Sequence, residues 1–262
     1  MRFTAGLSLF VASASGLTPM LRAQDSALDN NQATTQSTST DQHYERPVSW
    51  KLLPTNVLDD QKHIYSFPTR LEKKRVWIPT ALILGATAGL IVLDSHDAPY
   101  FRKTSSFNGF NSAFSGTATA VGTGLVPAGL YAVGLLHSDS KMKQTALLAG
   151  EAVADTEILA TILKESTRRI RPASKPPNSN FADTFYEGAG TSFPSGHSIV
   201  AFGVATVVAR RYGNHKWVPY VSYGAAALVA FSRVTLSAHY VSDVFLGAAL
   251  GYSVGRFAVL HQ

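Results

Sequence analysis

Residues 76–93 read VWIPTALILGATAGLIVL and contain no charged side chain. A continuous apolar run without strand-like alternation predicts a helix, and this one is long enough to cross a bilayer. Residues 117–136 form a second run, rich in Ala and Gly, and residues 145–163 form a third. The third run carries three acidic residues, Glu151, Asp155 and Glu157. Because carboxylates are costly against lipid, we expect these to face a bundle interior or water.

Three shorter apolar runs follow, at residues 198–209, 217–231 and 243–260. Their patterns are also helical, and no fixed-period repeat is visible. Helices that each bury an apolar face are expected to pack against one another. The sequence therefore predicts an all-α fold, a helical bundle of about six core helices.

Composition narrows the class of protein. The chain has 262 residues, of which 45% are hydrophobic and 15% charged, so it can bury a sizeable core. A net charge of +6 suits an anionic substrate or an anionic membrane surface, and we expect no nucleic acid partner. The absence of cysteine excludes disulfides, a thiolate nucleophile and cysteine-built metal sites.

The N-terminal residues 1–23 have the features of a secretory signal peptide: a basic start, an apolar stretch and a small residue at its end. An uncleaved membrane anchor is the alternative, which the Ser, Gly and Pro residues inside the stretch disfavour. Residues 24–70 are predicted to be a polar linker and N-terminal extension. The main domain is then expected at residues 71–262.

Basic clusters at residues 70–75, 141–143 and 210–216 are each separated from the next by two predicted helices. If all six helices span a membrane, these clusters share one side, as the positive-inside rule requires. A cleaved signal peptide would instead place residues 24–75 outside. The positive-inside rule and a cleaved signal peptide therefore place the first basic cluster on opposite sides of the membrane. We expect export to the cell envelope with the active site on the periplasmic side, and leave open an integral, a membrane-associated or a soluble protein.

Three short segments concentrate groups that bind anions or transfer protons. In the first, Lys164 and Arg171 are two helical turns apart, so we expect them on one helix face with Arg168 between them. Pro172 is expected to end that helix. Two cations there can clamp a phosphate, with the guanidinium bidentate. Alternatively they only favour the helix C-terminal dipole.

The second segment is Pro194-Ser195-Gly196-His197, which precedes an apolar run. Ser195 can cap the helix, and Gly196 lets the backbone approach a ligand closely. Unpaired N–H groups at such a helix start can hold phosphate oxygens. The alternative is an ordinary capped helix with His197 in solvent.

The third segment holds Ser232, Arg233, His239 and Asp243. The last two are four residues apart, so on a helix the carboxylate can accept a hydrogen bond from one ring nitrogen and leave the other as a nucleophile. A buried structural pair or a metal pair would have the same spacing. No further ligand accompanies it, so we expect no metal. A second acidic cluster is expected to be merely solvated: Asp94, His96 and Asp97.

Together the segments resemble the signature of the type 2 phosphatidic acid phosphatase (PAP2) and vanadium haloperoxidase superfamily. The pattern is Lys-x6-Arg-Pro, then Pro-Ser-Gly-His, then Ser-Arg-x5-His-x3-Asp, and all eleven specified positions agree in order. The resemblance implies a helical bundle and a metal-independent phosphatase. Its substrates would be phosphate monoesters, either lipid phosphates or small acid-phosphatase substrates, and its intermediate a phosphohistidine.

The resemblance also implies residue roles. His239 would be the nucleophile, Asp243 would orient its ring, and His197 would act as general acid and then base. The phosphate would be held by Lys164, Arg171, Ser195, Gly196 and Arg233. No cofactor is implied, with vanadate as an inhibitor; a vanadate-dependent haloperoxidase and a non-catalytic phosphate or lipid-headgroup binding protein are the alternatives. Residues 173–193 are expected either to set specificity or to pack against the bundle.

Overall fold

The structure is a computed structural model that describes residues 46–260, except residues 115 and 177–178. The predicted signal peptide and the first part of the predicted linker lie outside the described residues. Within them the secondary structure consists of helices and single helical turns, without a strand. The prediction of an all-α fold is confirmed.

Five of the six predicted apolar runs lie within a helix, and the sixth begins in one and extends past its end. In chain order these are α2 (Lys74–Lys103), α4 (Gly116–Leu136), α5 (Ser140–Thr167), α6 (Gly196–Arg211), α7 (Trp217–Thr235) and α8 (Val241–Val254). The chain continues from α8 into a π-helical turn, η3 (Gly255–Val259). Four elements were not predicted: α1 (Leu53–Tyr65), η1 (Phe67–Arg70), α3 (Asn108–Ala113) and η2 (Pro172–Ser174).

Side-chain caps determine where several helices begin. The carboxylate of Asp139 accepts a hydrogen bond from the Met142 amide at 2.9 Å and starts α5. Ser195 caps α6 by accepting from the Ser198 amide at 3.4 Å. Such caps satisfy amide groups that have no partner inside the helix.

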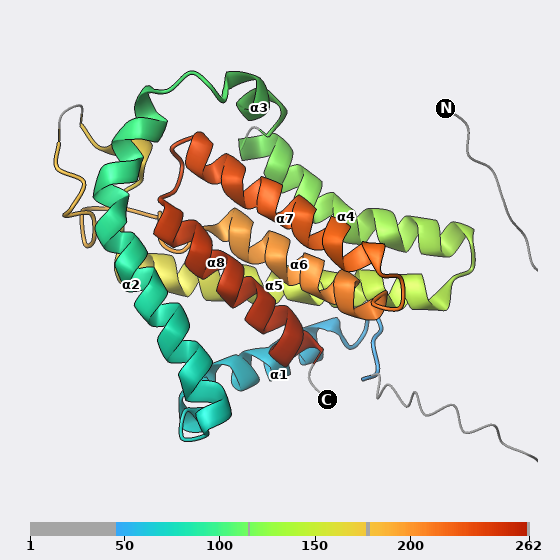
Figure 1. The fold of residues 1–262 in the computed structure, drawn as a ribbon. Helices are drawn as coiled ribbons and strands as arrows, with labels where there is room; N and C mark the ends of the chain where they lie inside the picture. Colours follow the sequence, from blue (N-terminus) through green and yellow to red (C-terminus); the bar gives the residue numbers. More distant parts are fainter. Residues whose placement is uncertain (1–45, 115, 177–178, 261–262) are drawn as a thin grey trace, which may run out of the picture. The chain divides into compact units, whose positions relative to one another are not determined.

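The helix α6 lies in the middle of the bundle, between α5, α7 and α8 (Figure 1). It buries residues on every side, as expected for a helix enclosed by others. The main apolar core joins α6 to α5, α8 and η3 through Leu148, Ala149, Ala152, Ala160, Ile199, Val200, Val204, Val207, Val254, Ala258 and Val259.

Helices α6 and α8 approach closely because of glycine. A β-carbon on Gly251 would lie 2.1 Å from the Ile199 carbonyl oxygen, and one on Gly255 would lie 2.8 Å from the Gly203 carbonyl oxygen. Only a residue without a side chain fits at such contacts. This packing holds the end of α8 and η3 against the first half of α6.

The N-terminal extension folds onto the bundle, where α1 contacts α5. Arg46 donates hydrogen bonds to Asp60 at 2.6 Å and to Glu151. Asp155, one turn further along α5, is also fully buried beneath α1. These two acidic residues of α5 therefore face the interior, as expected, whereas Glu157 is exposed.

The helix α2 packs beside α8 and exposes a long apolar side, with Leu82 69% and Val92 70% exposed. Among the described residues it is the one helix that is long and apolar enough to cross a membrane. Helix α4 comes nearest of the others, with a shorter apolar stretch at Val121–Leu136.

Candidate active site

The three motif segments lie at the same end of the bundle. Lys164 is in the last turn of α5 and Arg233 near the end of α7, whereas Gly196 and Asp243 lie in the first turns of α6 and α8. Core helices that follow one another in the chain run in opposite directions, so the ends of α5 and α7 meet the starts of α6 and α8. Residues far apart in the sequence are thereby brought together.

Two contacts join the segments directly. A β-carbon on Gly196 would lie 2.8 Å from the Lys164 ammonium nitrogen, so the ammonium rests against the start of α6. The Ser195 amide donates a hydrogen bond to the Asp243 carbonyl oxygen at 3.0 Å. His197 is the second residue of α6 and is half-buried.

Arg171 reaches the site by a different route from the one predicted. Helix α5 ends at Thr167, and Arg168 adopts a left-handed conformation with φ of 44°. Arg171 follows in extended backbone before η2, so the prediction that it shares a helix face with Lys164 is wrong. Arg168 itself is exposed.

The charge of Arg171 nevertheless acts on the other site residues. Burial first, and then the positive charge of Arg171, lower the pKa of Arg233. Burial is also the largest cause that lowers the pKa of Lys164; Glu157 opposes it and Arg171 adds to it. Arg171 therefore lies close enough to interact with both cations.

The guanidinium of Arg233 is held from the α3–α4 connection. Its Nη2 donates to the Phe114 carbonyl oxygen at 2.5 Å and to the Thr119 hydroxyl at 2.9 Å, and its Nε donates to Ser232 Oγ at 3.0 Å. Because the side chain is only 1% exposed, these bonds fix its direction. The third cation of the site is thus rigidly placed.

His239 is buried between the end of α7 and the start of α8. Its Nδ1 lies 2.7 Å from the Ser192 carbonyl oxygen and 3.6 Å from Asp243 Oδ2. The backbone carbonyl, rather than the predicted carboxylate, therefore accepts the Nδ1–H hydrogen bond. That bond selects the tautomer in which Nε2 keeps its lone pair.

The surroundings of His239 favour the neutral form of its ring. Burial lowers the pKa of His239, Asp243 opposes that shift, and the charge of Arg171 adds to it. A neutral imidazole with an available Nε2 is the reactive form of a histidine nucleophile.

Ser192 was missed by the sequence analysis, although it lies two residues before the Pro194 motif. Its hydroxyl donates to Asp243 Oδ2 at 2.5 Å, while its carbonyl accepts from His239. The Tyr240 amide donates to the same carboxylate oxygen at 2.9 Å. Asp243 therefore lies beside the imidazole without being its hydrogen-bond acceptor.

Arg169 was also missed, and it is fully buried. It donates to Asp243 Oδ1 at 2.5 Å and to Asp94 Oδ2 at 2.7 Å. The expectation that Asp94 is merely solvated is therefore wrong, since its side chain is 1% exposed and paired. The available signal was a carboxylate directly after the apolar run 76–93, because a charge in such a place needs a partner.

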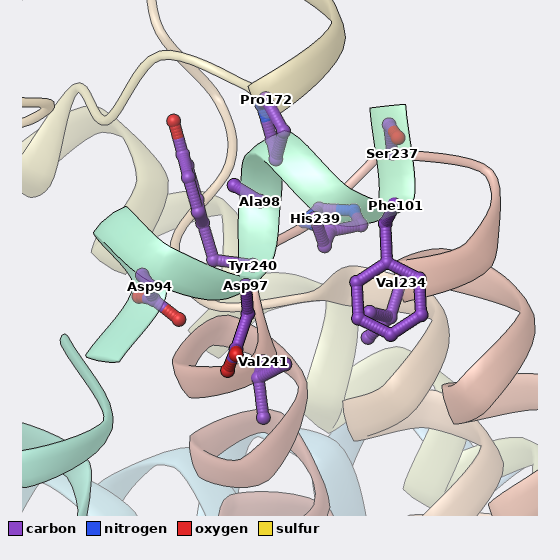
Figure 2. Close-up of a pocket in the computed structure, with 10 residues that line it drawn as sticks. All are labelled: Asp94, Asp97, Ala98, Phe101, Pro172, Val234, Ser237, His239, Tyr240 and Val241. Atoms are coloured by element: carbon purple, nitrogen blue, oxygen red, sulfur yellow. The ribbon is translucent and has the colours of Figure 1, made fainter. Parts of the chain in front are cut away.

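A pocket beside His239 is lined by the C-terminal part of α2 (Figure 2). Asp97, Ala98 and Phe101 of α2 face it together with the α7–α8 connection. Among the described residues no group of three His, Asp or Glu side chains could hold a metal ion.

The loop at residues 173–193 closes one side of this region. Phe181 is buried against Ala98 and Tyr240, and Phe185 lies 4.6 Å from the Arg169 guanidinium carbon. For these two aromatic residues the packing alternative is therefore correct. Tyr186 is instead 76% exposed.

The part of the chain that contains the site is similar to known proteins. A model described as the PAP2 superfamily matches residues 145–262. Lipid A 1-phosphatase of Porphyromonas gingivalis is 40% identical over 69 residues, 26% of this chain and 16% of that protein. Phosphatidylglycerophosphatase B of Bacillus subtilis is 38% identical over 102 residues, 36% of this chain and 46% of that protein. The chain thus spans less than half the length of either relative.

Two solved structures are similar in part. The crystal structure of Aquifex aeolicus LpxE covers 66% of this chain and 93% of its own, with 23% identity and a TM-score of 0.47. The crystal structure of a transmembrane PAP2-type phosphatidylglycerolphosphate phosphatase from Bacillus subtilis covers 79% of this chain and 94% of its own, with 20% identity and a TM-score of 0.41. The family match of residues 145–262 contains all three motif segments, so this part of the chain is similar to the PAP2 superfamily.

Proposed function

We propose that this protein is a metal-independent phosphatase that hydrolyses phosphate monoesters through a phosphohistidine. The observation that carries the proposal is the buried His239, whose Nδ1 is held by the Ser192 carbonyl oxygen, at the bundle end that also holds Lys164 and Arg233. The charge of Arg171 lowers the pKa of all three side chains. Phosphoryl transfer requires mainly positioning and charge stabilisation, which three cations and the α6 amide groups can supply.

In the first step the His239 Nε2 lone pair forms a bond to phosphorus while the bond to the alcohol oxygen breaks. His197 donates a proton to that oxygen, and the alcohol leaves. In the second step water attacks phosphorus, His197 takes its proton, and the N–P bond breaks to release inorganic phosphate. The ring carries a positive charge in the intermediate, which the nearby Asp243 carboxylate stabilises.

A vanadate-dependent haloperoxidase would use a similar anion site, and a binding protein would lack turnover. The relatives above carry the names of phosphatases, which favours hydrolysis. The purified chain should release phosphate from a monoester and should not oxidise halide when vanadate and peroxide are added. We expect EDTA to leave the activity unchanged and vanadate to inhibit it.

The experiment that tests the assignment is His239→Ala, with His137→Ala as the control at an exposed histidine outside the site. His239→Ala should reduce turnover by at least about 10³-fold, whereas the control should keep it. Quenching with alkaline detergent and labelled substrate should trap a phosphorylated protein, stable in base and labile in acid as a phosphohistidine is, only when His239 is present. Undiminished hydrolysis by the His239 variant would refute the mechanism.

We propose a lipid phosphate as the substrate class. The apolar, exposed helix α2 ends at the pocket beside His239, so a phosphate attached to a membrane lipid can reach the site along it. The relatives include phosphatases named for lipid A and phosphatidylglycerophosphate. In mixed micelles, kcat/KM should be higher for phosphatidic acid than for glycerol 3-phosphate. Equal values would favour a soluble monoester.

We propose that the protein is exported and membrane-associated, with the site on the periplasmic side. Support comes from the basic clusters, which lie at the other ends of the site helices: at the starts of α2, α5 and α7 and the end of α6. Arg102 and Lys103, at the site end of α2, depart from this pattern.

Cell fractionation followed by cysteine labelling tests this topology in a chain that has no natural cysteine. A cysteine introduced at Ser174, near the site, should react in intact cells with a membrane-impermeant reagent. One introduced at Ser140, at the other end of α5, should react only after lysis if the helices cross the membrane. Labelling of both positions in intact cells would indicate a peripheral periplasmic protein, and the state of residues 1–23 can be read from the mature N-terminus.

A further inference from the structure

A buried chain of charges links α2 to the candidate nucleophile. Asp94 in α2 accepts a hydrogen bond from Arg169 Nη2 at 2.7 Å, and Nη1 of the same guanidinium donates to Asp243 Oδ1 at 2.5 Å. The three side chains are fully buried or nearly so, with 0 to 1% exposure. Asp243 in turn lies 3.6 Å from His239 Nδ1.

The Arg169 guanidinium has further contacts besides the two carboxylates. Its Nε donates to Thr184 Oγ1 at 3.0 Å, and Nη1 also donates to Ser242 Oγ at 2.7 Å. Its Cζ lies 3.9 Å from the centre of the Tyr240 ring. Asp94 is held as well, because the Ser242 amide and hydroxyl both donate to it. The immobilised Arg169 guanidinium therefore holds the Asp243 carboxylate in one orientation.

The charges in this chain do not cancel. Two carboxylates share one guanidinium, which leaves one net negative charge beside the imidazole when both are ionised; burial raises the pKa of Asp94, and the hydrogen bonds from Ser242 and Arg169 oppose that shift. A charge of this kind favours a cationic ring over a neutral one, and low polarity strengthens the effect. When a phosphoryl group is on Nε2 the His239 ring is cationic. Its positive charge then balances the net negative charge of the three linked side chains of Asp94, Arg169 and Asp243.

We propose that Asp94 and Arg169 are positioning residues, which hold Asp243 in place and supply the negative charge that stabilises the phosphorylated His239 ring. The inference rests on the proposed function and adds to it two residues that act through Asp243. Asp94 belongs to α2, outside the segment matched by the family model. The N-terminal half of the chain thereby contributes to the chemistry of the motif residues.

Asp94→Asn tests the proposal, since it removes the charge and keeps the shape. We expect kcat for phosphate release to fall about 10-fold to 100-fold, the range seen for partners of directly acting groups, with KM changed less than about 3-fold. Glu165→Gln, which removes an exposed carboxylate at the same end of α5, is the matched control and should retain wild-type kcat. Wild-type kcat in a folded Asp94→Asn protein would overturn the proposal.

A double-mutant cycle separates positioning from a purely structural role. Because Asp94 acts through Asp243, adding Asp94→Asn to Asp243→Asn should lower kcat no more than about 2-fold further. Full additivity of the two losses would contradict the assigned path. Arg169→Lys supplies a second variant should Asp94→Asn fold poorly. It keeps the charge but cannot bridge two carboxylates, so kcat should fall about 10-fold or more.

Titration of the His239 ring by NMR gives a readout that does not need turnover. Asp94→Asn should lower the pKa of His239 further, because it removes a negative charge from the chain, whereas Glu165→Gln should not move it. An unchanged pKa together with a lowered Tm would mean that Asp94 is only structural. If the wild-type protein hydrolyses no monoester, the proposed function fails. The titration still decides whether the charge of Asp94 affects the pKa of the His239 ring.

Discussion

The ammonium group of Lys164 rests against the backbone of Gly196, 2.8 Å from the position that a β-carbon would occupy there. The neighbour is the tip of a flexible side chain, so Gly196→Ala can be accommodated by moving the ammonium away. The fold is then kept, while the cation is displaced from the start of α6. Misplacing such a group by about 1 Å can cost about 10²-fold in rate.

We therefore expect Gly196→Ala to lower kcat/KM about 10²-fold with little change in Tm. Gly150→Ala, in the middle of α5 with no atom within 4 Å of its β-carbon position, is the control and should keep full activity. Phosphate-release kinetics beside thermal unfolding measure both quantities. A large fall in Tm for Gly196→Ala would show that the contact serves folding instead.

The pH dependence of activity should reflect the lowered pKa of His239. The ring must be deprotonated to attack, and burial lowers its pKa below the ordinary 6.5. The acid limb of kcat/KM should therefore have its midpoint below pH 6.5, and activity should persist under mildly acidic conditions.

Removing the charge of Arg171 tests whether the acid limb of the pH profile reports the titration of His239. The charge of Arg171 also lowers the pKa of His239, so Arg171→Gln should move the midpoint upward even though it weakens phosphate binding. A midpoint that stays in place would assign the limb to another group.

Stability should fall as the pH rises, because of Asp155. Burial is the largest cause that raises the pKa of this carboxyl to about 8; the Gln61 hydrogen bond opposes it, and Asp60 and Glu151 raise it further. A folded-state pKa above the unfolded value of 3.8 means that the stabilisation is complete below pH 3.8. It is lost as the pH rises toward 8.

Thermal unfolding in detergent at pH 5.5 and pH 8 measures this loss. We expect Tm to be lower at pH 8 by more than about 2–4 °C, the shift that about 1 kcal/mol produces in a domain of this size. Asp155→Asn, which stays uncharged, should remove most of the difference, and Glu157→Gln on the exposed side of α5 should not. Equal pH dependence in wild type and Asp155→Asn would place the titration elsewhere.

The helices were predictable where burial depends on apolar side chains. The run at residues 198–209 is apolar on every side because α6 is enclosed by α5, α7 and α8. Helix α1 was not predictable in this way, because its two buried residues are the polar Asp60 and Gln61. They are buried through hydrogen bonds to Arg46 and Asp155, which a search for apolar periodicity does not detect.

The site residues that belong to the sequence motif could be predicted. The site features that depend on tertiary contacts could not. Lys164 and Gly196 meet as the pattern implied. The predicted end of α5 was wrong because Arg168 takes a left-handed conformation, which usually indicates glycine, and an arginine does not signal it. Arg169 was missed because its partner Asp94 lies 75 residues away in the sequence.

The close packing of α6 and α8 predicts opposite effects for the same substitution at two glycines. At Gly251 a β-carbon would lie 2.1 Å from the Ile199 carbonyl oxygen and 3.0 Å from the Gly203 amide nitrogen, and backbone atoms can yield only if the helices separate. Gly251→Ala should therefore destabilise the fold by about 1–3 kcal/mol. At Gly150 the position is open, so Ala should stabilise α5 by up to about 1 kcal/mol.

Thermal unfolding of the two variants under one set of conditions measures the difference. Activity gives a second readout, because α6 and α8 carry the proposed phosphate-binding residue Gly196 and the Asp243 carboxylate on their adjoining ends. Separating the helices should lower kcat/KM in Gly251→Ala, whereas Gly150→Ala leaves those ends in place. If Gly251→Ala were as stable and as active as Gly150→Ala, the backbone contact at Ile199 could not be what sets the distance between the two catalytic segments.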